Sequence, residues 1–453
     1  MTTGTVMAVD LHEACKKRLK QTLLEALGKM GVLNGTFLNY MTVHELAVCD
    51  TVLPHKGQVA DRLKSYVNET PFSSFVEELL SHDLYLNGTY EQDRDGLLRD
   101  EPRYVGLPEA SDAIVEVFSD LPRQYTYSMP LAEDMGILLP DDLNEYILSD
   151  KVRLVRVLDN FTEAYPLSTG DQGKDKKLHK INSLLIGPSD PRWNKGTLCL
   201  QHKDEGFAGH YNKLAPDQRA EANFKAFMGI GIAIRLLDYR YYFRTNFNKA
   251  FFYIHAEGKE KRSIRHKRDV EPSFEDGLPH VVPHPSMKDF PDKDSLRLWQ
   301  LSCLRKVHDC FSDDGDAGQR IRLAGQWLFD SYTGKNELLG FVQAMVCLEI
   351  LFGEGEPTGE IGLSALLRNR CAYLIGRSQK HRSEILREFQ ELYVVRSKIV
   401  HTGKSGLNRN ERIMLYRLRQ ICADAIAAEI RLISGDQLGA LARMFQKSTQ
   451  DQT

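Results

Sequence analysis

The sequence predicts a multidomain protein that is mainly α-helical, with an α/β middle region and a C-terminal helical bundle. Three observations predict this class. The chain has 453 residues, which is more than one ordinary hydrophobic core accommodates. Apolar residues recur at three- and four-residue spacing along much of the chain, as in amphipathic helices. Between about residues 150 and 270 the pattern changes to short apolar runs, which are typical of strands.

Residues 1–150 are expected to be mainly helical. The stretches 8–30 and 57–85 have amphipathic helical spacing, and the polar stretch 88–108 has the composition of a loop. No signal peptide is expected at the N-terminus, and no apolar run approaches the roughly 18 residues that span a bilayer, so no contact with a membrane is expected. The eight cysteines form no CxxC pair or metal-type cluster, so we expect a cytoplasmic protein without a metal or cofactor.

Residues 151–270 are expected to form the α/β middle domain. A helix is expected from Ala220 to Leu237. The apolar runs expected to be strands are Val152–Leu158, Ile181–Ile186, Leu198–Leu200 and Phe251–Ile254. Five prolines then fall between Asp269 and Lys293, which predicts a linker over residues 271–293.

A basic run follows the last expected strand. Residues 259–268 include six Lys and Arg, among them Lys261, Arg262 and Arg265. Such a run can bind an RNA backbone, because each neutralised phosphate adds salt-dependent affinity. A solvated loop without a function is the alternative interpretation.

Residues 294–453 are expected to form the helical bundle. Apolar spacing and Gly or polar breaks predict helices near residues 295–311, 320–332, 338–352, 361–375, 383–403 and 408–433. Between residues 320 and 431 there are 17 Lys and Arg against 12 Asp and Glu, although the whole chain has a net charge of −3. This local excess favours contact with phosphate, but it is also ordinary for a solvated helical surface.

One short motif near the end of the fifth of these helices is the main functional signal. Arg396, Ser397 and His401 lie within about one and a half helical turns, and Gly403 is suited to end the helix just after them. Ser397 and His401 are four residues apart and share a face. A permanent cation beside a group that titrates near neutrality suits cleavage of a phosphodiester without a metal. A surface Arg and a helix-ending His with no role are the alternative.

The order of these helices, with Leu348-Glu349, then Cys371 to Gly376, then Leu392-Tyr393 leading into Arg396 to His401, resembles the Apea-like branch of the HEPN superfamily. The resemblance covers residues 319–433. It implies an all-helical, dimeric domain and, as in many members, a metal-independent RNA endonuclease of bacterial anti-phage (abortive infection) or toxin systems. By this resemblance Arg396 and His401 match the catalytic pair and Ser397 matches the polar position after the Arg, where many members have Asn. Gly403 stands where an adenylylated subgroup has Tyr, so that regulation is not expected.

The chemistry of RNA cleavage is compatible with these residues. The ribose 2′-hydroxyl is the nucleophile, so the protein supplies a proton acceptor, a proton donor and positive charge. His401 could transfer the proton, Arg396 could pair with phosphate oxygens, and Glu349, a lone acid in an apolar helix, could orient either of them or simply pair with an Arg. Lys398 and Lys404 are expected to contact the RNA backbone. One His is few for acid–base chemistry, which favours a homodimer or a higher symmetric oligomer.

Three functions remain open from the sequence. The first is the RNA endonuclease, with RNA (tRNA by analogy) as substrate and residues 1–290 sensing a phage-derived or nucleic-acid trigger. The second is a non-catalytic HEPN module that dimerises or binds RNA or nucleotide for a partner protein. The third is an enzyme in the α/β region, for which we find no nucleophile or acid pair.

Overall fold

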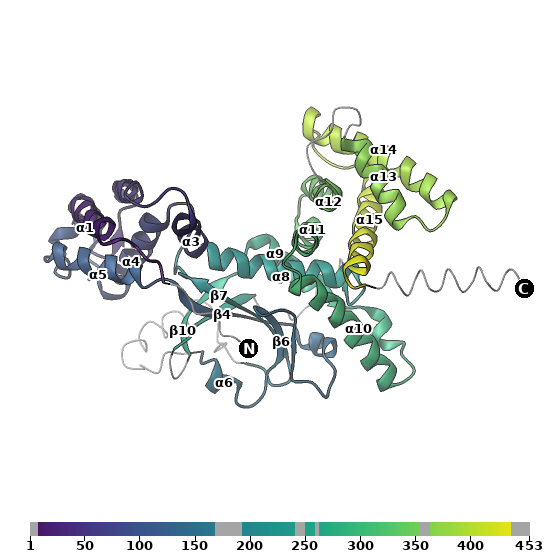
Figure 1. Ribbon diagram of the computed structural model, residues 1–453, viewed down its shortest axis with the longest axis horizontal. Coiled ribbons are helices and arrows are strands. Elements are labelled where there is room, and N and C mark those ends of the chain that lie inside the picture. Colours follow the sequence, from purple (N-terminus) through teal and green to yellow (C-terminus); the bar gives the residue numbers. More distant parts are fainter. Residues whose placement is uncertain (1–7, 168–192, 241–249, 259–261, 354–362, 436–453) are drawn as a thin grey trace, which may run out of the picture. The chain divides into compact units, whose positions relative to one another are not determined.

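The computed structural model describes residues 8–167, 193–240, 250–258, 262–353 and 363–435 (Figure 1). This part of the chain is mainly helical with a sheet-containing region, as predicted. It divides into two compact units. Unit 1 comprises Met1–Tyr127, Lys203–Ala220 and Ile254–Arg268, and unit 2 comprises Ser128–His202, Glu221–Tyr253 and Asp269–Thr453. The division expected at residue 150 does not coincide with either unit, because each unit is assembled from three separate stretches.

Unit 1 contains the N-terminal helices and a small antiparallel sheet in the order β2-β1-β3. Helix α1 buries Leu19, Leu23 and Leu27 against α5, which accounts for the apolar spacing in the sequence. The stretch 88–108, expected to be a loop, also contains β3 and η2. The elements are α1 (Glu13–Leu27), β1 (Gly31–Leu33), β2 (Phe37–Leu38), η1 (Tyr40–Leu46), α2 (Ala47–Asp50), α3 (Gln58–Tyr66), α4 (Pro71–Asn87), β3 (Gly96–Leu97), η2 (Leu98–Asp100) and α5 (Leu107–Ser119).

A loop of unit 1 is held by a buried carboxylate of α4. Glu78 accepts hydrogen bonds from the backbone N–H groups of His210 (2.6 Å), Tyr211 (3.0 Å) and Asn212 (2.5 Å). The same helix carries His82, whose ring stacks on that of His210 with 3.5 Å between centroids. Three charge-assisted bonds and a ring stack therefore position this loop.

A six-stranded sheet runs through the described residues in the order β10-β9-β4-β7-β6-β5. Strands β5, β6 and β7 pair antiparallel, with Leu154 opposite both Tyr146 and Leu200. The expected run Ile181–Ile186 lies outside the described residues. The strands are β4 (Arg123–Pro130), β5 (Glu145–Ile147), β6 (Val152–Arg156), β7 (Leu198–Gly206), β9 (Phe251–Ala256) and β10 (Ser263–Asp269).

Residues 8–150 are mainly helical, as expected, and also contain strand β4. Tyr125, Tyr127 and Met129 alternate with polar residues along it, and all three are buried. That two-residue alternation is a strand signal, and it was present in the sequence.

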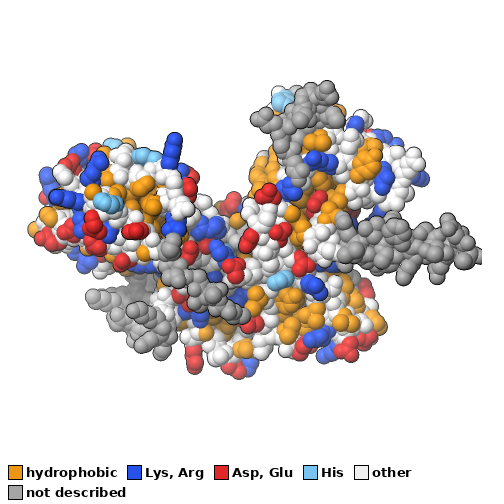
Figure 2. Space-filling view, viewed as in Figure 1, with side chains coloured by type: hydrophobic (Ala, Val, Ile, Leu, Met, Phe, Trp, Pro, Cys, Tyr) orange, Lys and Arg blue, Asp and Glu red, His pale blue; other side chains and the backbone are white. Residues whose placement is uncertain are grey.

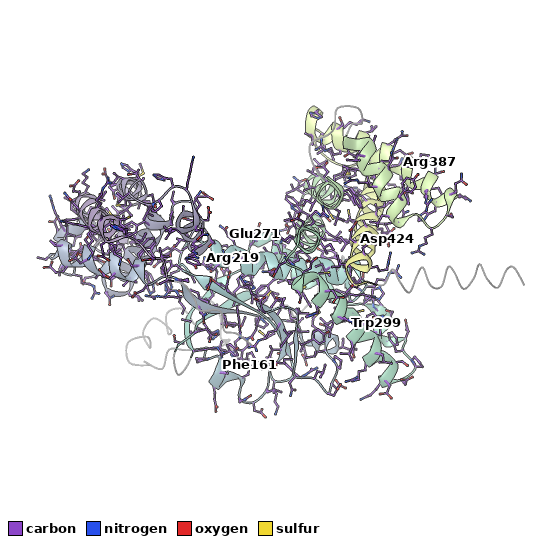
Figure 3. The ribbon with its side chains drawn as sticks, in the orientation of Figure 1. Phe161, Arg219, Glu271, Trp299, Arg387 and Asp424 are labelled. Atoms are coloured by element: carbon purple, nitrogen blue, oxygen red, sulfur yellow. The ribbon has the colours of Figure 1, made fainter. Side chains whose placement is uncertain are left out.

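The Pro-rich stretch 271–293, expected to be a linker, is folded into unit 2. It contains α9 (Pro272–Gly277), η4 (Leu278–His280), β11 (Val281–Pro283), which pairs with β8 (Leu237–Tyr239), and η5 (Pro285–Lys288). The buried Lys225 of α8 (Ala215–Ala233) bridges Glu271 at 2.7 Å and Asp330 at 3.0 Å (Glu271 is labelled in Figure 3). This ion-pair network and the buried Phe274 attach the stretch to α8 and α11.

The described residues of the C-terminal part of unit 2 form six packed helices, which agrees with the predicted helical bundle. Asp292, Asn336, Ser378 and Asn408 cap α10, α12, α14 and α15 through side chains that accept backbone hydrogen bonds. Helix α12 packs against α11, α13, α14 and α15. The helices are α10 (Lys293–Ser312), α11 (Asp316–Thr333), α12 (Glu337–Phe352), α13 (Leu363–Ile375), α14 (Gln379–Thr402) and α15 (Arg409–Ile433).

All eight cysteines are free thiols, and seven of them are buried. Among the helices of the described residues, none is long and apolar enough to span a membrane.

Candidate functional site

Helix α14 positions the motif that the sequence singled out. It begins at Gln379, where the Ser378 side chain accepts a hydrogen bond from the backbone N–H of His381. It ends at Thr402, and Gly403 follows in the left-handed conformation with φ 63°. His401 therefore lies in the last helical turn, as predicted, and its side chain is exposed.

The two predicted catalytic residues face different surroundings. The Arg396 guanidinium is directed toward α12, where its Nη2 lies 3.7 Å from Oε1 of Glu349. The Arg396 and Glu349 side chains are 31% and 24% exposed, so the pair is partly accessible to solvent. Within the described part of the chain no hydrogen bond or ion pair joins Arg396 to His401. Five residues apart on an α-helix, they are separated by roughly 140° around the axis, so one copy of α14 does not bring them into direct contact.

Glu349 pairs with Arg396, which agrees with both interpretations of this acid, a support for the motif and a simple ion pair. Helix α12 is apolar almost throughout, and Glu349 faces α14 rather than the bundle core. The separation of 3.7 Å is longer than a normal hydrogen bond, so the guanidinium is held by charge. Its Nε is buried and has no hydrogen-bond partner among the described residues. Arg396 is therefore anchored without a complete set of hydrogen bonds.

Tyr393 completes this group and was not expected there from the sequence, which assigned it to the helix core. Its Oη is buried without a hydrogen-bond partner among the described residues. Burial, and to a lesser extent the charge of Glu349, raise the pKa of the Tyr393 phenol to about 12, and Arg396 opposes the rise. Tyr393 is three residues before Arg396, which puts both on one side of α14. We call Glu349, Tyr393 and Arg396 the α12–α14 cluster.

The other predicted residues of α14 have separate surroundings. Ser397 and Lys398 are exposed on its surface. Lys404, expected to bind RNA, instead pairs with Glu411 at 3.0 Å. The backbone N–H of Asn408 donates to Glu411 at 2.8 Å, which lowers the pKa of that carboxyl, and Lys404 and Lys398 lower it further. The Lys404 side chain thus helps to hold the start of α15.

The described part of the basic run, residues 262–268, lies almost entirely in a strand and does not form the loop considered from the sequence. Lys261 lies outside the described residues, and Ser263–Asp269 is strand β10. Arg262 donates to Glu257 at 2.8 Å, and Glu257 also accepts a hydrogen bond from Thr126. Arg265 donates to the Ala208 carbonyl. Arg262 and Arg265 thus make structural contacts inside unit 1, whereas the α12–α14 cluster belongs to unit 2.

Comparison with known proteins returned no family profile, no curated protein and no solved structure that matches this chain.

Proposed function

We propose that this protein is a metal-independent RNA endonuclease of the HEPN type, acting in bacterial anti-phage defence, with Arg396 and His401 as its reacting residues. The observation that carries the proposal is the Arg396–Glu349 pair, in which a permanent cation is held at a partly exposed position near the end of α14. The resemblance of residues 319–433 to the Apea-like branch of the HEPN superfamily supports the same function and the defence role.

The proposed reaction uses the nucleophile that RNA itself carries. The 2′-hydroxyl loses its proton as its oxygen forms a bond to phosphorus, and the bond between phosphorus and the 5′-oxygen breaks as that oxygen gains a proton. His401, exposed at the end of α14, has the access to RNA that either proton transfer requires. Arg396 would bind the non-bridging oxygens and stabilise the charge of the transition state.

A symmetric dimer would supply the second titratable group. One copy has one motif histidine, and proton acceptance and donation by separate groups require two. Support for association comes from large apolar side chains exposed on α14 and α15, namely Val394 (53%), Val400 (48%), Ile413 (61%) and Tyr416 (56%). A dimer that uses α14 and α15 would remove these apolar side chains from water.

One observation favours a second candidate function, a non-catalytic RNA-binding module. In one copy Arg396 pairs with Glu349, and among the described residues no hydrogen bond or ion pair joins Arg396 to His401. An anchored Arg and an exposed His could bind phosphate without cleaving it.

The test incubates the full-length protein with total RNA in EDTA. Wild type is compared with His401→Ala and Arg396→Ala, and with the controls His55→Ala and Arg431→Ala, which change exposed side chains elsewhere. The proposal expects chelator-resistant cleavage that falls by about 10² to 10⁴ in His401→Ala and persists in both controls. Cleavage at the wild-type rate in His401→Ala and Arg396→Ala would refute it. A gel shift without cleavage would support the binding module.

A further inference from the structure

The turn between α13 and α14 carries a concentration of positive charge. From Leu363 to Arg387 there are six Lys and Arg and a single acid, Glu384, although the whole chain has a net charge of −3. Four of the six side chains are exposed, namely Arg377, Lys380, Arg382 and Arg387. Figure 2 shows Lys and Arg side chains interspersed with apolar ones over α13 and α14. In Figure 3 Arg387 projects from the outer side of α14.

An exposed aromatic ring lies within this basic region. The Tyr373 side chain on α13 is 72% exposed, which is unusually high for a residue of its size. The Arg382 guanidinium lies 5.2 Å from the centroid of the Tyr373 ring, so the two form a cation–π pair at the surface. The backbone favours this arrangement, because a Cβ at Gly376 would overlap Cγ of Arg382.

The exposed cations of α14 lie on two sides of the helix, because Lys380 and Arg387 are about 140° to 160° around its axis from Arg382. Lys380 and Arg387 are seven residues apart and therefore share one face of the helix. Arg377 lies in the turn between α13 and α14. The nearby acid Glu388 is paired with Arg417 of α15 at 3.1 Å, so its charge is compensated within the bundle.

We propose that Tyr373, Arg377 and Arg382 form a binding surface for single-stranded RNA, which we call the α13–α14 surface. An exposed ring offers a stacking platform to an unpaired base, and the surrounding cations pair with the phosphates on either side of that base. A double helix keeps its bases stacked on one another, so it could use the charges but not the ring. The choice of RNA over DNA rests on the proposed function.

The position of this surface along α14 gives it a role distinct from cleavage. Arg382 precedes His401 by 19 positions, which corresponds to about 28 Å along a helix that rises 1.5 Å per residue. A stacked strand rises about 3.4 Å per nucleotide, so about eight nucleotides would separate the two positions. The α13–α14 surface would therefore hold long RNA at a distance from the scissile phosphate, and a dinucleotide would not reach it.

The test measures binding by fluorescence anisotropy with a labelled, unstructured 20-nucleotide RNA and the full-length His401→Ala protein, which keeps the RNA intact. Adding Tyr373→Ala is expected to weaken binding by about 5- to 150-fold, and Tyr373→Phe, which keeps the ring, by less than about twofold. Arg377→Gln and Arg382→Gln are each expected to reduce the slope of log K against log salt by about 0.7. Arg431→Gln, on the last turn of α15, is the matched control and is expected to leave the slope unchanged.

Several results would overturn the α13–α14 surface. These are absence of RNA binding by the His401→Ala protein, equal affinities of the Tyr373→Ala and Tyr373→Phe proteins, and equal affinity for an RNA duplex. Binding to anionic phospholipid vesicles that survives Tyr373→Ala, with no effect of that change on RNA, would indicate a membrane instead. The two proposals are distinguishable. If RNA binds through Tyr373 but wild type never cuts it, the nuclease is refuted and the RNA-binding surface is not. Dinucleotide cleavage at the wild-type rate in Tyr373→Ala is expected.

Discussion

Nη2 of Arg396 lies 3.7 Å from Oε1 of Glu349, so the motif on α14 is connected to the neighbouring helix α12 by an ion pair. This ion pair explains the presence of an acid, Glu349, in an otherwise apolar helix. A carboxylate in that position attracts the guanidinium and restricts it to one side of α14. The pair therefore defines where a phosphate could meet Arg396.

Changing Glu349 to Gln is expected to slow RNA cleavage by about 10- to 100-fold, the range observed when a supporting residue is removed from behind a functional one. The amide keeps the shape of the side chain but does not attract the guanidinium. In a double-mutant cycle, Glu349→Gln and Arg396→Ala are expected to be non-additive. The control is Glu337→Gln on the same helix, whose exposed pair with Arg412 at 2.8 Å lies outside the cluster. Fully additive effects of Glu349→Gln and Arg396→Ala would mean that Glu349 does not act through Arg396.

Tyr393→Phe is expected to leave the free energy of unfolding within about 1 kcal/mol of wild type or to raise it. The Tyr393 Oη is buried without a hydrogen-bond partner among the described residues, so its removal deletes a desolvated polar atom and no bond. Urea denaturation measures this change, and RNA cleavage is expected to stay within about twofold. A tenfold loss of cleavage at unchanged stability would show that this hydroxyl takes part in the chemistry.

Glu78→Gln is expected to destabilise unit 1 by about 2–4 kcal/mol. The carboxylate accepts three backbone hydrogen bonds from residues 210–212, and an amide loses both the charge and part of the accepting capacity. Glu77→Gln is the control, because Glu77 contacts the same loop only through the Asn212 side chain at 3.2 Å. We expect a loss below about 1 kcal/mol there. Urea denaturation compares both variants with wild type, and equal losses would contradict the role of Glu78.

His210 is expected to make the folded state less stable as the pH falls below about 6.5. Burial, together with the charges of Arg265, His82 and Arg268, lowers the pKa of His210 to about 3. The unfolded chain, with an ordinary pKa of about 6.5, takes up this proton first, so stability is complete above pH 6.5 and is lost toward pH 3.

Between pH 7 and pH 5 the protonation of His210 in the unfolded chain lowers the free energy of unfolding by about 2 kcal/mol. His210→Gln is expected to remove this part of the pH dependence of the free energy of unfolding. The control His55→Gln is expected to have the same pH dependence as wild type. Asp217, whose pKa burial raises to about 6, has the opposite dependence in all three proteins, so it cancels in the difference. Chemical denaturation at both pH values provides the measurement. Parallel pH profiles for wild type and His210→Gln would contradict the stacked, neutral His82–His210 pair.

Helices that carry their own local signals were predictable from the sequence. The expected helix 338–352 is α12 (Glu337–Phe352), and the expected helix 408–433 is α15 (Arg409–Ile433). In both, an Asn at the start and regular apolar spacing are encoded within a few residues of each other. Gly403, the residue expected to end the motif helix, has the left-handed backbone that this role requires.

Expectations based on composition alone were less successful. The five prolines in residues 269–293 indicated a linker, yet short helices and β11 form there, because Phe274, Val281 and Met287 are buried against the rest of unit 2. RNA binding by Arg262 and Arg265 stays a prediction, and each of them makes a hydrogen bond within unit 1 that the sequence did not indicate. The composition of a segment does not specify which residues its charged side chains and prolines contact.

The sequence by itself determined the helices of the bundle and the spacing of Arg396, Ser397 and His401 along one of them, because helical periodicity and capping act over a few residues. Only the tertiary structure decided that Arg396 faces Glu349, that Tyr393 joins them, and that Lys404 belongs to the start of α15. These pairings join residues on different helices or turns. They depend on how the helices pack, and local spacing carries no information about that.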